Sequence, residues 1–172
     1  GKVLGFEELE KLDSYGRYLD SDNDGICYRT YPGTHPEKGA YFTRGTSHDE
    51  YARYTEDGNI NAETLMRLMR KFRTASELVP PPIIEINGED SCGIIYYGSS
   101  KPAVLEAKDI LKTKDINVDL MQIRSFPFNL DVWEFIASHD RIYVVEQNRD
   151  SQMRTLIMAE GGISAEILRP LV

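Results

Sequence analysis

The sequence has few of the residues that usually form a metal centre or a disulfide framework. Its 172 residues include two cysteines and three histidines, and no Cys-x-x-Cys or Cys/His metal spacing occurs. Cys27 and Cys92 are far apart, which is typical of free thiols in a reducing compartment and favours a cytoplasmic protein. No apolar run approaches the roughly 20 residues that span a bilayer, and no signal-peptide pattern is present, so a membrane location is not expected.

Positive charge is also scarce. The chain has 20 Lys and Arg against 28 Asp and Glu, a net charge of −8, and it contains no basic block. This balance weighs against nucleic acid or an anionic membrane as a partner. The 41% apolar content is enough for a sizeable core, and the length fits one α/β domain with an extension.

Residues 81–172 alternate between strand and helix patterns. The predicted strands are Ile83–Ile86, Gly93–Tyr97, Val118–Ile123, Arg141–Glu146 and Ile163–Leu168, and the predicted helices are Lys101–Lys114, Leu130–His139 and Ser151–Glu160. This alternation predicts an α/β domain, with a mainly parallel sheet between two helical layers. The proline triplet at 80–82 marks a boundary, so residues 1–80 are expected to form an extended arm plus one helix, Asn61–Leu78.

The α/β half has no fingerprint that names a ligand. Ligands of such sheets bind at the carboxyl ends of the strands, but neither GxGxxG nor GxxxxGK[ST] occurs. The Gly98–Lys101 turn at a helix N-terminus could receive a phosphate or could be a tight turn alone. A nucleotide- or coenzyme A-binding module therefore stays open as one function.

The most unusual stretch is Tyr31–Glu56. It has neither a helical nor a strand period, yet it is dense in aromatic residues interleaved with charges. Long irregular segments of this kind are usually functional or disordered, and its aromatic content disfavours disorder. We interpret the segment as an ordered arm that lies across another protein surface.

Just before the arm, Asp20, Asp22, Asp24 and Gly25 match the first half of a calcium loop. The twelfth position of that loop should be a glutamate, but here it is Tyr31. Alternating aspartates also form turns with backbone amides and need no ion for this. A turn and a weak cation site are both open.

Three side chains of this region are candidates for chemistry. Arg29 precedes the Tyr31 turn, and an Arg fork binds a carboxylate through two parallel hydrogen bonds. Thr43 lies between two glycine turns, where its hydroxyl could face a small anion. His48 stands beside two acids and could move protons or form an interface. Pairing of Arg29 with a nearby Asp, and a turn role for His48, are the structural alternatives.

The residues also resemble a known family. The run DGICYRTYPGTHPEKGAYFTRGTSHDEYARYTEDG is similar to a signature segment in the α subunits of 2-oxoacid:ferredoxin oxidoreductases, particularly the 2-oxoglutarate type. The later runs YYGSSKPAVLEA, FPFNLDVWEF and VVEQNRDSQMRTLI are similar to the α/β domain that ends those subunits. The resemblance implies a C-terminal fragment of such an α subunit.

This resemblance implies a function. The family oxidises a 2-oxoacid on thiamine diphosphate, transfers the acyl group to coenzyme A and passes electrons through an iron–sulfur cluster to ferredoxin. The cofactors and Mg²⁺ would be held by the β subunit and by preceding domains, none by this chain, which is expected to be inactive alone. Residues 81–172 would resemble the transketolase C-terminal domain and brace the active site. Arg29 and Thr43 would contact the substrate. A purely assembly role for the arm remains the alternative.

Overall fold

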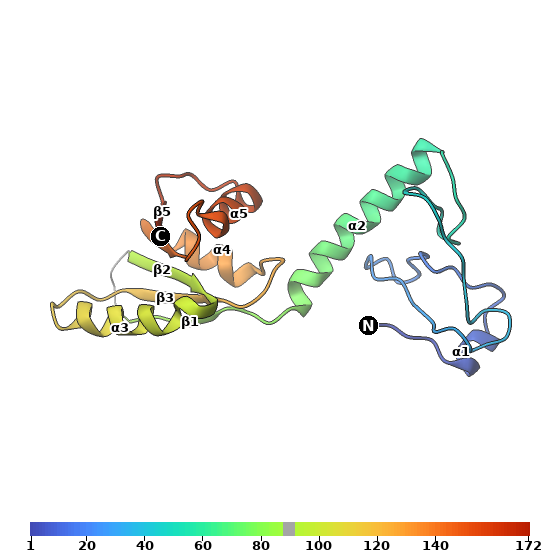
Figure 1. The fold of residues 1–172 in the computed structure, drawn as a ribbon, viewed down its shortest axis with the longest axis horizontal. Helices are drawn as coiled ribbons and strands as arrows, with labels where there is room; N and C mark the ends of the chain where they lie inside the picture. The colour runs from blue at the N-terminus through green and yellow to red at the C-terminus, as the bar shows by residue number, and fades with distance from the viewer. Residues whose placement is uncertain (88–91) are drawn as a thin grey trace. The chain divides into compact units, whose positions relative to one another are not determined.

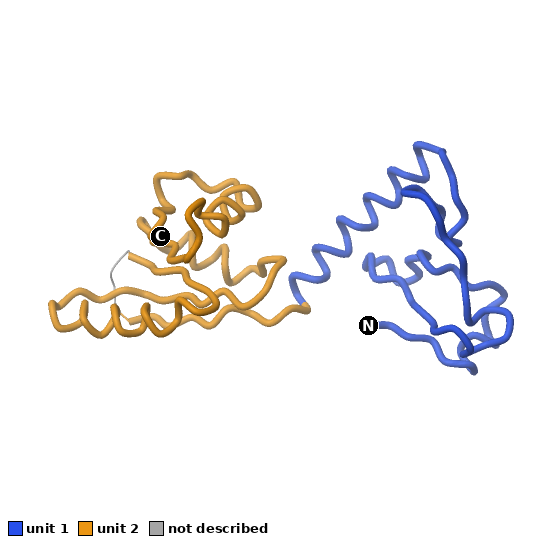
Figure 2. The backbone as a smooth tube through the Cα atoms, viewed as in Figure 1, with its two compact units in different colours: residues 1–77 blue, residues 78–172 orange. Residues whose placement is uncertain are grey.

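The computed structural model describes residues 1–87 and 92–172, and these form two compact units. The first unit comprises Gly1–Glu77 and the second Leu78–Val172 (Figure 2). The division lies three residues before the expected boundary at 80/81.

The second unit is built on a five-stranded sheet with the order β1-β3-β2-β4-β5 (Figure 1). Its strands are β1 (Ile83–Glu85), β2 (Cys92–Tyr97), β3 (Asp119–Ile123), β4 (Arg141–Val145) and β5 (Leu168–Leu171). β1 pairs antiparallel with β3, whereas β2 pairs parallel with β3 and β4, and β5 pairs parallel with β4. The predicted α/β class and mainly parallel sheet are confirmed.

Helices cover both faces of this sheet. A short 3-10 turn, η1 (Gly98–Ser100), leads into α3 (Lys101–Lys112), and α4 (Leu130–Ala137) and α5 (Gln152–Gly161) follow later in the chain. The side chains of β2 alternate between the faces, because successive Cβ atoms of a strand point in opposite directions. Ile95 joins the core under α4 and α5, whereas Ile94 joins a smaller cluster with Val104 of α3.

The predicted last strand, Ile163–Leu168, is wrong except for Leu168. Gly162 ends α5 in the left-handed region at φ +61°, and the following residues form a turn in which Ile167 N–H bonds Ser164 C=O at 3.3 Å. The strand begins only where the chain reaches β4, and it includes Pro170. Proline is tolerated there because β5 is an edge strand.

The first unit has little regular structure. It contains α1 (Phe6–Glu10), α2 (Gly58–Leu78, whose last residue belongs to the second unit) and two isolated bridges, Val3–Arg29 and His48–Tyr54. α2 begins three residues before the predicted start because Asp57, not Asn61, caps it: Asp57 Oδ1 accepts the N–H of Asn59 at 2.8 Å.

The first unit also has a very small core. The structure describes all 77 of its residues, and Leu9 and Ala52 are the hydrophobic side chains that are buried in it. No residue of α2 is buried, and Leu65, Met66 and Met69 are each more than half exposed. An apolar stripe this open is typical of a protein–protein contact surface.

Candidate functional site

The aspartate-rich loop at Asp20–Gly25 is attached to helix α2. Asp20 accepts the Gly25 N–H at 2.9 Å and pairs with Arg70 of α2 at 3.0 Å. Thr74 of α2 donates its hydroxyl to the Asp24 carbonyl at 2.6 Å, and Arg67 donates to the Gly25 carbonyl at 3.0 Å. The loop therefore holds the helix against the rest of the unit.

The other two carboxylates of this loop, those of Asp22 and Asp24, form ion pairs with the side-chain ammonium of Lys2. Lys2 Nζ lies 2.6 Å from Asp22 and 2.7 Å from Asp24. Among the described residues, no group of three or more His, Cys, Asp or Glu side chains is arranged to hold a metal ion. The aspartates therefore form a hydrogen-bonded turn, and Lys2 and Arg70 neutralise their negative charges.

The ion triad of Lys2, Asp22 and Asp24 predicts that the isolated Val3–Arg29 bridge is sensitive to acid. The hydrogen bonds from Lys2 lower the pKa of Asp22 and of Asp24 below their ordinary value of 3.8. A lowered folded-state pKa contributes stability that is present above about pH 4 and is lost as the pH falls through the folded-state pKa. We expect Lys2→Met to reduce amide-exchange protection of Leu4 and Arg29 at about pH 7 and to have little further effect near pH 2. An equal loss at both pH values would contradict the triad's role.

The N-terminal segment, through the isolated Val3–Arg29 bridge, places the Arg29 backbone. Arg29 N–H donates to the Lys2 carbonyl at 3.0 Å, and its own carbonyl accepts the Leu4 N–H at 2.9 Å. The exposed guanidinium lies 5.6 Å from the Tyr31 ring centroid, and no carboxylate of the described residues lies within 4 Å of it. The expected alternative, pairing with a neighbouring Asp, is therefore not what the structure has.

A cavity of about 360 Å³ lies within the arm. It is lined by Thr30, Pro32, Gly39, Ala40, Tyr41, Phe42 and Thr43. The Thr43 hydroxyl oxygen is buried and has no hydrogen-bond partner among the described residues. Thr30 lines the same cavity, and its hydroxyl oxygen is also buried without a hydrogen-bond partner among the described residues. A buried hydroxyl without a partner is unfavourable, so this cavity is a place where a ligand group would be stabilised.

The walls of the cavity are fixed by a turn at His35. His35 is 6% exposed, and its Nδ1 accepts the N–H groups of Glu37 and Lys38 at 3.1 and 3.0 Å. Its Nε2 lies 2.7 Å from Glu10, and Gly39 N–H bonds the His35 carbonyl at 3.0 Å. A Cβ on Gly39 would lie 2.4 Å from that carbonyl oxygen, so only glycine fits there.

The structure thus brings Thr43 to the cavity with Thr30, and it places Arg29 and His48 outside the cavity wall. His48 stacks on Tyr18 with ring centroids 3.8 Å apart, and its Nδ1 lies 3.3 Å from the Asp49 carbonyl. Its role as a proton carrier or interface residue stays a prediction. Sequence reasoning missed Thr30, although a hydroxyl directly after the candidate Arg29 was a signal for it.

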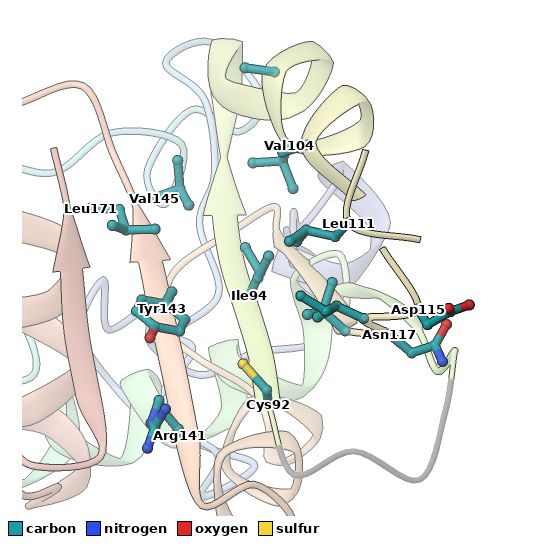
Figure 3. Close-up of a pocket in the computed structure, with 14 residues that line it drawn as sticks. Cys92, Ile94, Val104, Leu111, Asp115, Asn117, Arg141, Tyr143, Val145 and Leu171 are labelled. Carbon is teal, nitrogen blue, oxygen red and sulfur yellow. The ribbon is translucent and has the colours of Figure 1, made fainter. Parts of the chain in front are cut away.

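The second unit carries a larger, more apolar groove of about 890 Å³ (Figure 3). It runs along the sheet face beside α3, over Ile94, Tyr143, Val145 and Leu171, with Arg141 and Asp115 among its lining. None of residues 98–101 lines it, so the candidate phosphate turn and the groove are separate. Among residues 1–87 and 92–172, no helix combines the length and the hydrophobicity that a membrane span requires.

Comparison with known proteins gives a consistent set of relatives. No model of a known protein family matches the chain. The sequence is 28% identical over 158 residues to 2-oxoacid:ferredoxin oxidoreductase 2, subunit alpha, of Aeropyrum pernix, covering 88% of this chain and 24% of that protein. It is 28% identical over 124 residues to the 2-oxoacid:ferredoxin oxidoreductase subunit alpha of Saccharolobus solfataricus, covering 69% and 20%.

A solved structure has the same fold. The 2-oxoglutarate:ferredoxin oxidoreductase of Magnetococcus marinus, with 2-oxoglutarate, coenzyme A and succinyl-CoA bound, superimposes with a TM-score of 0.80 over 99% of this chain and 29% of its own. The sequences are 22% identical, so this likeness concerns the fold. The chain spans about a quarter of the length of the curated relatives that it matches.

Proposed function

Because this chain is a homologue of the α subunits of 2-oxoacid:ferredoxin oxidoreductases, we propose that it forms part of such a subunit and contributes substrate contacts through its arm. The resemblance expected from residues 24–58 is confirmed at the level of this family. We further propose 2-oxoglutarate as the 2-oxoacid, which is supported by the fold shared with the Magnetococcus marinus enzyme. Coenzyme A and ferredoxin would be the acceptors of the acyl group and of the electrons.

One observation carries the substrate role: a cavity of small-molecule size in the arm is lined by Thr43, whose buried hydroxyl has no hydrogen-bond partner among the described residues. The Arg29 backbone is fixed by two hydrogen bonds while its guanidinium is left without a carboxylate among the described residues. A guanidinium fork binds a carboxylate strongly because both hydrogen bonds are charge-assisted. We assign Arg29 to a substrate carboxylate and Thr43 to a neighbouring substrate oxygen.

The cofactors of the proposed enzyme are assigned elsewhere. In the complete enzyme, thiamine diphosphate would supply the decarboxylation chemistry and the iron–sulfur cluster the electron-transfer chemistry. The described residues present no metal-ligand cluster that fits Mg²⁺ or an iron–sulfur group. We propose that the β subunit and other α-subunit domains hold these groups. This chain's part is to bind and orient.

The remaining surface supports a bracing role. The arm leaves Tyr31, Phe42 and Tyr54 more than half exposed, with Phe42 at 81%, and α2 buries no side chain. Burial of such aromatic area is a main source of binding energy at interfaces. We propose that these surfaces contact the β subunit and the other α-subunit domains, and that residues 81–172 act as a transketolase C-terminal-like brace.

The experiment is Arg29→Ala in the complete enzyme with all subunits and cofactors. We expect kcat/KM for the 2-oxoacid to fall about 100-fold, since a lost charge-assisted contact is worth about 2 to 3 kcal/mol. Arg53→Ala is the matched control, because the Arg53 guanidinium lies at the same 5.6 Å from a tyrosine ring, that of Tyr51, and no substrate contact is assigned to it. An unchanged kcat/KM in Arg29→Ala, with normal assembly, would refute the carboxylate assignment.

A purely assembly role for the arm is the second candidate, and the exposed aromatic residues favour it. Under that function Phe42→Ala would prevent association with the other subunits. In such an arm, Arg29→Ala and Thr43→Val would leave KM unaltered in whatever complex still forms. Gel filtration of the reconstituted subunits, followed by a KM measurement on the complex, separates the two functions.

A further inference from the structure

The lining of the cavity in the arm includes a second threonine with a buried hydroxyl, Thr30, that the family resemblance does not assign. Thr30 is 7% exposed, and its Oγ1 has no hydrogen-bond partner in the described part of the chain. Within residues 1–77, two side-chain polar atoms are buried without a hydrogen-bond partner: the hydroxyl oxygens of Thr30 and Thr43. Both belong to the lining of the same cavity, although thirteen positions separate them in the sequence. Two unpaired hydroxyls at one cavity are a coincidence that a shared ligand explains.

The cavity suits one kind of ligand group. A threonine hydroxyl can donate one hydrogen bond and accept others, so two of them can serve two oxygens of one small molecule. The rest of the lining is Pro32, Gly39 and Ala40 with the aromatic residues Tyr41 and Phe42, and it includes no acidic side chain. This combination of a short apolar wall and two hydroxyls fits an oxygen-bearing end of a short aliphatic acid.

The position of Thr30 is also preorganised. It directly follows Arg29, whose backbone N–H and C=O are hydrogen-bonded to Lys2 and Leu4. It precedes Tyr31, whose carbonyl accepts the Thr34 N–H at 3.1 Å. A side chain on a backbone fixed from both directions loses little freedom when it binds, which is the property of a positioning residue.

We propose that Thr30 is a further substrate-binding residue, and that its hydroxyl and that of Thr43 together hold oxygens of the 2-oxoacid in this cavity. This inference rests on the proposed function of the arm. It adds a residue that sets the position and the specificity of the substrate, because a site with two unpaired hydroxyls discriminates against molecules that cannot bond to both.

The test is Thr30→Val in the complete enzyme, because valine has nearly the same shape and lacks the hydroxyl. We expect KM for the 2-oxoacid to rise about 10-fold, as for the loss of one hydrogen bond in a buried site. Thr30→Ser should stay within about twofold of the parent, because it keeps the hydroxyl. The melting temperature of Thr30→Val without substrate should not fall, since the removed hydroxyl has no partner to lose.

Thr34→Val is the matched control: the same substitution is made four positions away, at a half-buried threonine that does not line the cavity. An unchanged KM in Thr30→Val, with Arg29→Ala still impaired, would mean that solvent occupies the hydroxyls, and it would overturn this inference alone. A lower melting temperature without a change in KM would assign Thr30 a structural role and would also overturn it. If Thr30→Val and Arg29→Ala were both unimpaired, the proposed function itself would fail.

Discussion

Replacing Gly25 by alanine is expected to destabilise the first unit by about 3 to 5 kcal/mol. Gly25 has φ +81°, a conformation that costs an L-residue about 1 to 2 kcal/mol. A Cβ there would lie 2.2 Å from the backbone nitrogen of Lys71 and 2.7 Å from the Arg67 carbonyl oxygen. Overpacking against backbone typically costs a further 1 to 3 kcal/mol or more, because no side chain can move aside. In a unit with so small a core, the loop should separate from α2.

The measurement is hydrogen exchange of the amides in residues 16–30 and 64–78, which should lose protection together. Gly33→Ala is the matched control, because Gly33 has φ +86° but a Cβ added to it would meet no atom within 4 Å. It should cost only the backbone term of about 1 kcal/mol. Equal effects of the two substitutions would show that the close approach of the loop to α2 is not what requires glycine at position 25.

Removing the Glu146 carboxylate is expected to destabilise the second unit by about 3 to 4 kcal/mol. Glu146 follows β4, is 2% exposed, and accepts the backbone N–H groups of Met153 at 2.9 Å and Arg154 at 3.2 Å. It also accepts a hydrogen bond from the Asn148 amide. The carboxylate therefore caps the N-terminus of α5 in a buried position, and Glu146→Ala leaves buried donors without an acceptor at about 1 to 3 kcal/mol each.

Urea unfolding followed by the fluorescence of Trp133, the chain's single tryptophan, reports on this unit. Glu146→Gln should show about half the loss, because an amide oxygen still accepts one N–H but carries no charge for the helix terminus. Glu160→Ala, an exposed glutamate near the other end of α5, should change the stability by less than about 0.5 kcal/mol. A loss in Glu160→Ala as large as in Glu146→Ala would contradict the capping role.

Local patterns predicted most of the second unit. Each central strand is a short apolar run that ends in turn residues, and each helix carries an apolar face, so type and order followed directly from the sequence. The helices Lys101–Lys112 and Leu130–Ala137 start at the predicted residues. Ile110, which belongs to the apolar face of α3, is 51% exposed, because α3 packs on the sheet through Val104 and Leu111. Which part of an apolar stripe touches the sheet depends on helix placement, which no local pattern records.

The candidate site was predictable only in part. Arg29 and Thr43 could be selected from side-chain chemistry and family resemblance, whereas Thr30 becomes a candidate only when its unpaired hydroxyl is seen beside that of Thr43. In the aspartate loop, by contrast, the sequence showed the motif but not the partners of its carboxylates. Its spacing matched half of a cation site, yet its counter-charges are Lys2 and Arg70, which lie 18 and 50 positions from Asp20 in the sequence.

By itself, the sequence determined the α/β class, the change of secondary-structure pattern near the proline triplet and the resemblance to 2-oxoacid:ferredoxin oxidoreductase α subunits. These depend on local periodicity and on contiguous motifs. Tertiary structure alone decided which carboxylates are neutralised by which cations, which glycines touch backbone and which hydroxyls are left unpaired in a cavity. Each of these depends on residues distant in sequence, whose meeting is set by the packing of the whole unit and by no segment of it.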